Sequence, residues 1–223
     1  MQTLSHSEAR RYYDRLGSVQ DWQRPFEQPA RESMTRRSAL PEARAVFELG
    51  CGTGRFGKDL LESGLPLDAR YLAVDASETM LKLARKNLAR FGQRVEVRAS
   101  SGEMRFDVPD ASFDRFLSTY VFDLLSERNI EAALAEAHRM LRPGGLLGLV
   151  SLTHGATGFA RQIERAWMAM YRYAPALTGG CRPLELLPRL PVGRWRLRHH
   201  EVLTRLGISS EVVVAERSAA AGC

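Results

Sequence analysis

The 223-residue chain has few cysteines and no long apolar run. Its three cysteines, Cys51, Cys181 and Cys223, form no CxxC pair and have no histidine at zinc-ligand spacing, which argues against a disulfide framework and a metal site. The longest apolar stretch, residues 146–152, has the length of a strand and is too short to cross a bilayer. The polar first residues do not resemble a secretory signal. These absences predict a cytoplasmic protein with free thiols, no metal and no transmembrane segment.

Positive charge is in excess and lies towards the ends of the chain. The net charge is +6, and from His154 onward ten arginines stand against five carboxylates. Such a basic periphery is compatible with an anionic substrate or with peripheral contact to a membrane surface. It is equally compatible with a solvated arginine-rich surface.

The middle of the chain alternates short apolar runs with helical patterns. Strands are expected at residues 45–49, 71–75, 95–99, 113–118 and 146–152, and helices at 55–63, 78–91 and 130–141. Alternation of this kind produces right-handed βαβ units and a parallel sheet covered on both faces. The prediction is a doubly wound α/β fold whose sheet is mostly parallel.

The two ends of the chain depart from this pattern, although all of residues 1–223 are expected to form one domain. Residues 1–40 look helical and predict an N-terminal cap before a core at 45–153. Residues 154–194 combine a helix at 159–173 with an irregular stretch, and the helix carries an apolar stripe of Phe159, Ile163, Trp167, Met170 and Tyr171. Residues 195–217 predict an antiparallel hairpin with its turn at Gly207-Ile208, which brings the sheet to seven strands.

The sharpest chemical signal is the run Glu48-Leu49-Gly50-Cys51-Gly52-Thr53-Gly54, between the first strand and the first helix. Glycines here let the backbone pass close to a ligand, in the crevice beyond the carboxyl ends of the strands. The next strand ends in Asp75, whose carboxylate can accept both hydroxyl protons of a ribose. Together these features indicate a pocket for a nucleoside-containing cofactor.

The register of the glycines discriminates between cofactors. Residues 52–57 match the dinucleotide pattern GxGxxG, but that pattern should begin directly at the end of the strand. The glycine at the strand end is Gly50, and a pattern that begins there has Arg55 in place of its third glycine. The spacing Glu48-x-Gly50-x-Gly52-x-Gly54 instead resembles the first motif of class I S-adenosylmethionine (SAM)-dependent methyltransferases.

The resemblance extends over residues 10–153 and the terminal hairpin. Residues 74–81 (VDASETML) look like the second motif of the family, residues 109–114 (PDASFD) like the entry to the fourth strand, and residues 141–145 (LRPGG) like the turn before the fifth. Tyr13-Asp14-Arg15 and the spacing of the rest resemble the ubiquinone/menaquinone C-methyltransferase and phospholipid N-methyltransferase group.

This resemblance implies a set of SAM contacts. In the family the aspartate at the Asp75 position holds the ribose, the methionine at the Met80 position packs on the adenine, and the glutamate at the Glu48 position lies near the methionine end. Glu48 could equally just brace the loop. An aspartate often found after the third strand is missing from residues 100–104 (SSGEM). The implied contacts are Glu48, Gly50, Cys51, Gly52, Thr53, Gly54, Asp75, Ala76, Met80, Ser101, Gly102 and Ser118.

Methyl transfer is a direct displacement, so holding the nucleophile, methyl and sulfur in line is the main contribution of the protein, worth roughly 7–11 kcal/mol. Tyr13 and Tyr120 are candidates for cation–π contact with the sulfonium, and His154, after the fifth strand, for deprotonating the acceptor. Tyr120 could instead be core and His154 an ordinary surface histidine.

The sequence thus predicts a SAM-dependent methyltransferase acting on a small or lipid-like acceptor, which could carry an anionic group. The acceptor is expected between the N-terminal helix and the 159–173 helix, where Arg161, Arg165 and Arg172 could grip a carboxylate or phosphate. Alternatives are an RNA methyltransferase, suggested by the pI of 9.6 but lacking an RNA-binding module, an NAD-dependent oxidoreductase, and a non-catalytic SAM-binding protein.

Overall fold

A computed structural model describes residues 24–173 and 180–218. One seven-stranded sheet forms its centre, with strand order β3-β2-β1-β4-β5-β7-β6. The strands are β1 (Ala45–Leu49), β2 (Arg70–Asp75), β3 (Val95–Ala99), β4 (Phe113–Thr119), β5 (Leu141–Leu152), β6 (Trp195–Arg205) and β7 (Ile208–Arg217). The first five pair in parallel, and β7 inserts antiparallel between β5 and β6. The predicted fold class is confirmed.

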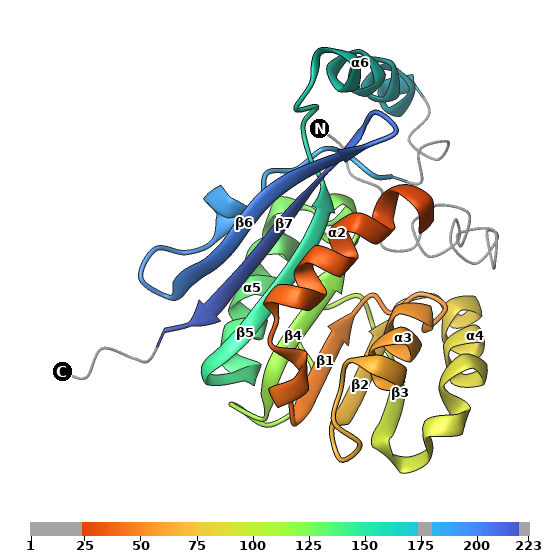
Figure 1. The fold of residues 1–223 in the computed structure, drawn as a ribbon, viewed down its shortest axis with the longest axis vertical. Coiled ribbons are helices and arrows are strands. Elements are labelled where there is room, and N and C mark those ends of the chain that lie inside the picture. The colour runs from red at the N-terminus through yellow and green to blue at the C-terminus, as the bar shows by residue number, and fades with distance from the viewer. Residues whose placement is uncertain (1–23, 174–179, 219–223) are drawn as a thin grey trace.

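Helices cover both faces of this sheet (Figure 1). The helices α2 (Arg24–Arg37), α3 (Arg55–Ser63) and α4 (Glu78–Leu88) pack on one face, and α5 (Glu127–Met140) packs on the other. The last helix, α6 (Gly158–Tyr173), stands beyond the end of the sheet. None of the described helices is long and apolar enough to span a membrane.

The helix α2 belongs to the predicted N-terminal cap, and it lies against β5, β6 and β7. Arg115 of β4 fixes its C-terminal end: the buried guanidinium donates to the carbonyl oxygens of Ser38, at 2.6 Å, and Ala39, at 2.5 Å. Carbonyl groups at a helix end have no partner within the helix, so these bonds satisfy them. The strand β4, which is followed directly by Tyr120, is thereby tied to α2.

Three boundaries differ from the sequence prediction by three residues or more. The helix α4 ends at Leu88 and continues as a 3₁₀ turn to Arg94, in which Gly92 leaves helical geometry. The helix α5 begins three residues earlier than predicted because Ser126 caps it. Residues 142–145 lie within β5 as a bulge whose first three residues are exposed, before regular pairing resumes at Leu146.

The hairpin turn also lies one residue earlier than predicted. It consists of Leu206 and Gly207, and Arg205 pairs with Ile208, which is the first residue of β7. Both turn residues have positive φ, 51° and 78°. Two-residue hairpin turns that match the twist of the strands need positive φ at both positions. Glycine adopts positive φ without strain, which explains why Gly207 occupies one of the two positions.

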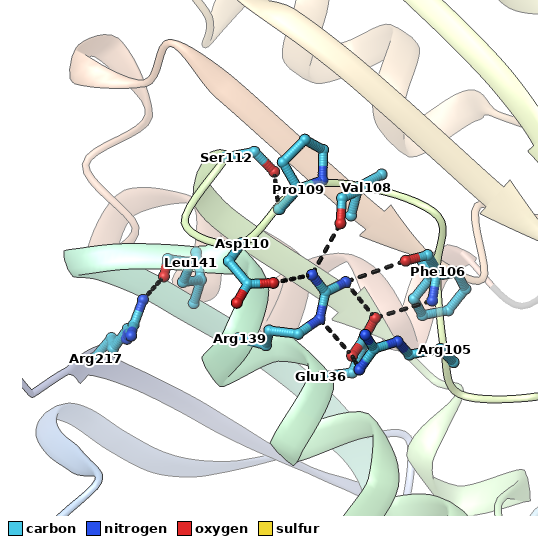
Figure 2. A network of polar contacts seen from close by, with 10 residues as sticks. All are labelled: Arg105, Phe106, Val108, Pro109, Asp110, Ser112, Glu136, Arg139, Leu141 and Arg217. Atoms are coloured by element: carbon cyan, nitrogen blue, oxygen red, sulfur yellow. Dashed lines mark hydrogen bonds and ion pairs between the residues drawn. The ribbon is translucent and has the colours of Figure 1, made fainter.

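The connection from β3 to β4 contains no helix in this fold, and an arginine on α5 holds it (Figure 2). Arg139 donates to the carbonyl oxygens of Phe106 and Val108, and it pairs with Asp110. The carboxylate of Glu136 accepts both from this arginine and from the Phe106 amide, at 2.9 Å. The network fastens the segment that follows the predicted adenine contacts.

Candidate cofactor and acceptor site

The glycine loop is folded tightly against the end of β2. The amides of Gly50 and Cys51 both donate to the carbonyl oxygen of Val74, at 2.7 and 3.0 Å. Gly50, Gly52 and Gly54 all have positive φ, from 52° to 75°. A Cβ on Gly50 would lie 2.2 Å from a Val121 methyl group. Only glycine therefore fits here without strain.

Asp75 links this loop to the start of α4. One carboxylate oxygen accepts from the Gly52 amide at 2.8 Å, and the other accepts from the Ser77 amide at 2.9 Å. Each carboxylate oxygen has two lone pairs, so the half-buried group retains acceptor capacity for further donors. The geometry suits a ribose, whose two hydroxyl groups are donors on neighbouring carbons.

Glu48 lies beneath the loop. Its side chain is 1% exposed and accepts a hydrogen bond from the Tyr71 hydroxyl at 2.9 Å. Burial raises the pKa of Glu48 to about 7, although the hydrogen bond from Tyr71 and the charge of Arg31 oppose the shift. Gly57 of α3 packs against both side chains. Glu48 thus braces the loop from below in this structure, and its predicted contact with the cofactor stays a prediction.

The other predicted cofactor residues lie around the same edge of the sheet. Cys51 is buried, and burial raises the pKa of its thiol well above the usual range, so the thiol is protonated and not a nucleophile at neutral pH. The Ser118 hydroxyl donates to the Leu49 carbonyl oxygen at 3.0 Å, and the Thr53 carbonyl oxygen accepts from Asn87 of α4 at 2.9 Å. Both contacts tie the loop to its neighbours.

The segments on the adenine side differ in their exposure. Met80 is 1% exposed, on the inner face of α4, and Ala76 is half-buried. After β3, Ser101 is exposed, while Gly102 has a φ of 92° and donates its amide to the Ser100 hydroxyl at 3.1 Å. Contacts of these residues with a cofactor remain predictions.

Two of the three candidate catalytic residues lie in the described part of the chain, and they have different partners. Tyr120 has a φ of 58°, and its hydroxyl group hydrogen-bonds with Ser210 of β7 at 2.9 Å. His154 is exposed, and its Nδ1 lies 2.6 Å from a Glu164 carboxylate oxygen on α6. Tyr13 lies outside the described residues.

Arg31 is a cation beside the loop that sequence reasoning did not find. Its guanidinium group lies 5.7 Å from the ring centroids of both Phe56 and Tyr120 and forms an ion pair with Glu27 at 2.9 Å. Its buried Nε has no hydrogen-bond partner in the described part of the chain. The i,i+4 spacing from Glu27 predicts the ion pair but not the approach of α2 to the loop.

Asp123 is a second residue that was missed. It is completely buried just after β4, and neither carboxylate oxygen accepts a well-formed hydrogen bond within the described residues. Burial raises its pKa to about 7, with weaker opposing effects that include the Cys181 thiol. An acidic residue in the otherwise apolar stretch 120–125 (YVFDLL) was the available signal.

A cavity of about 350 Å³ opens beside the end of β5. Met168 of α6 and Leu184 provide apolar walls, and two arginines contribute charge. Arg182 donates to the carbonyl oxygen of Leu125 and pairs with Glu127 at 3.2 Å. The residues that line the cavity are Ser126, Glu127, His154, Glu164, Met168, Arg182, Pro183, Leu184 and Arg189.

The parallel strands, the antiparallel β7 and the loop that Asp75 holds form the fold that the resemblance to class I SAM-dependent methyltransferases predicts. Comparison with known families agrees, because residues 46–145 match the model of the methyltransferase domain family.

Two curated relatives and one solved structure show the range of similar proteins. The chain is 30% identical over 153 residues to demethylmenaquinone methyltransferase of Tropheryma whipplei (strain Twist). The aligned residues make up 66% of this chain and 60% of that relative. It is 30% identical over 144 residues to malonyl-[acyl-carrier protein] O-methyltransferase of Erwinia pyrifoliae, and these residues make up 65% of this chain and 50% of that relative.

The N-methyltransferase NodS of Bradyrhizobium japonicum, in complex with S-adenosyl-L-homocysteine, has the same fold. It superposes with a TM-score of 0.70 at 15% identity, over 94% of this chain and 98% of that structure. The chain spans between half and two thirds of the length of the two curated relatives that it matches.

Proposed function

We propose that this protein transfers the methyl group of SAM to a small or lipid-like acceptor. The observation that carries the proposal is the Asp75 carboxylate, which is held by the Gly52 and Ser77 amides beside a loop of three positive-φ glycines. When bound, SAM would supply an activated methyl group on a sulfonium. The chain would contribute the alignment of the acceptor with that methyl group.

The residues present fit such a cofactor at both ends. Asp75 would accept the ribose hydroxyl groups, and the backbone of Gly50 and Gly52 leaves room for close approach. Arg31 would hold the carboxylate of the methionine part, because it stands between the first turn of α3 and the end of β4 with an unused donor. A charge-assisted hydrogen bond of this kind is worth about 1.5–3 kcal/mol.

Calorimetry tests the choice of cofactor. S-adenosylhomocysteine should bind, and NAD should bind far more weakly. Arg31→Ala should weaken binding of S-adenosylhomocysteine by about ten- to a hundredfold and leave methylthioadenosine, which has no carboxylate, unaffected. Binding of NAD without S-adenosylhomocysteine would refute the proposed function, whereas equal losses for both nucleosides would refute only the role of Arg31.

The cavity beside β5 supports a small acceptor. Its volume of about 350 Å³ lies within the range of ligand pockets, and its lining joins apolar side chains to charged side chains of both signs. Met168 and Leu184 would contact the apolar part of the acceptor, and Arg182 and Arg189 would lie near any anionic part. The related demethylmenaquinone and malonyl-[acyl-carrier protein] methyltransferases make a quinone-like or carboxylate-bearing acceptor worth testing first.

Two methionines on the same helix provide a matched test of this cavity. Met168→Trp would fill it, whereas Met170→Trp changes a residue that is 37% exposed and does not line the cavity. We expect the first variant to raise the KM for the acceptor several-fold, with the affinity for S-adenosylhomocysteine unchanged. An unchanged KM in both variants would place the acceptor elsewhere.

A further inference from the structure

The outer face of α6 is apolar although it faces solvent. Phe159 is 66% exposed, Met170 is 37% exposed and Tyr173 is 91% exposed. With Ala166 they follow one another at intervals of seven, four and three residues, so they share one face of the helix. The predicted apolar stripe therefore divides: Tyr171 is buried, Ile163 and Trp167 are half-buried, and Phe159 and Met170 point outward.

The tip of the β6–β7 hairpin extends this apolar face. A Cβ on Gly207 would lie 2.1 Å from Ile163 and 3.0 Å from the Phe159 ring, which shows that the tip packs directly on the start of α6. The neighbouring Leu206 is 69% exposed. Helix and tip stand together at one end of the molecule (Figure 1). We call Phe159, Met170, Tyr173 and Leu206 the apolar tip.

Exposed arginines lie around the apolar tip. Arg161, Arg165 and Arg172 lie on the neighbouring flank of α6, and Arg205 precedes the hairpin turn. All four are exposed, and none has an ion pair or a side-chain hydrogen bond within residues 24–173 and 180–218. The only carboxylate of the helix, Glu164, lies next to Arg165 in the sequence, accepts a hydrogen bond from the Gly155 amide, at 2.8 Å, and pairs with His154.

We propose that the apolar tip and its four arginines dock the protein on an anionic lipid surface. A helix that lies in a membrane interface combines exposed aromatic and aliphatic residues with arginines that reach the headgroups. Each arginine near an anionic surface strengthens binding by about fivefold. The same charges disfavour a second copy of the chain as the occupant, because two tips would bring eight arginines together. Docking would place the cavity beneath α6 close to the membrane.

Sedimentation with phosphatidylcholine vesicles, with and without phosphatidylglycerol, tests the proposal on the full chain. We expect binding to the vesicles that contain phosphatidylglycerol, and we expect salt to weaken it. Phe159→Asp combined with Leu206→Asn should reduce the bound fraction at least tenfold. The triple variant Arg161→Gln/Arg165→Gln/Arg172→Gln should reduce it by about a hundredfold.

Matched control variants test whether vesicle binding depends on the apolar tip or on any exposed apolar residue. Leu67 and Val192 are 86% and 102% exposed and precede β2 and β6, at the end of the sheet opposite the β6–β7 turn, so Leu67→Asp and Val192→Asp should bind vesicles like the wild type. Unchanged affinity for S-adenosylhomocysteine in every variant would show that each is folded. Absence of vesicle binding, equal binding to both vesicle types, or a dimer that the tip variants abolish would each overturn the proposal.

Discussion

Replacing Glu48 by glutamine should stabilise the protein, and the gain should depend on pH. Burial raises the pKa of Glu48 from 4.5 to about 7 in the folded chain. Between these values the unfolded state releases the proton while the folded state keeps it, so the wild type loses stability as pH rises. A difference of 2.5 pKa units corresponds to about 3 kcal/mol. Glutamine is neutral throughout and can still accept from Tyr71.

Urea unfolding followed by circular dichroism at pH 5 to 8, without cofactor, measures this effect. The variant should exceed the wild type in free energy of unfolding by about 3 kcal/mol at pH 8 and by much less at pH 5. Tyr71→Phe removes a hydrogen bond that lowers the pKa of Glu48, so it should extend the loss of stability above pH 7. A difference between Glu48→Gln and the wild type that does not change with pH would refute the reasoning.

Three further predictions concern the same edge of the sheet. Asp75→Ala should weaken binding of S-adenosylhomocysteine by about 1.5–3 kcal/mol, and calorimetry showing an unchanged Kd with the fold intact would remove Asp75 from the site. Gly54→Ala should lower the melting temperature more than Gly92→Ala. Both glycines have positive φ, but only at Gly54 would an added Cβ lie 2.9 Å from the Ala84 backbone. An equal decrease in melting temperature for the two variants would contradict this. Asp123→Asn should gain stability relative to the wild type as pH rises from 4 to 7, by up to about 4 kcal/mol, and a pH-independent difference in urea unfolding would mean that the carboxyl is not buried as described.

The central elements could be predicted from the sequence because their local signals agree. The bounds of β1, β3 and α3 coincide with the prediction, since apolar periodicity, glycines and chain order all indicate the same boundaries. The contact between Asp75 and the glycine loop also follows from order, because adjacent parallel strands end at one edge.

Contacts between distant segments could not be predicted in this way. The approach of Arg31 to Tyr120 depends on how α2 lies across the sheet, and no local pattern encodes that position. The helix α6 shows the limit of periodicity, because a stripe of apolar residues indicates a face but not what covers it. The structure buries Tyr171 and leaves Phe159 in solvent.

The network around Arg139 has a consequence for the dynamics of the adenine side. The β3–β4 connection lacks a helix, yet the Phe106 amide donates to a carboxylate that is itself 4% exposed. Such an amide should exchange with deuterium as slowly as one inside a helix, because it is released only when α5 separates from the connection. The segment would then lose its conformational entropy during folding and not during binding. A ligand that binds beside it would contact a surface that is already rigid.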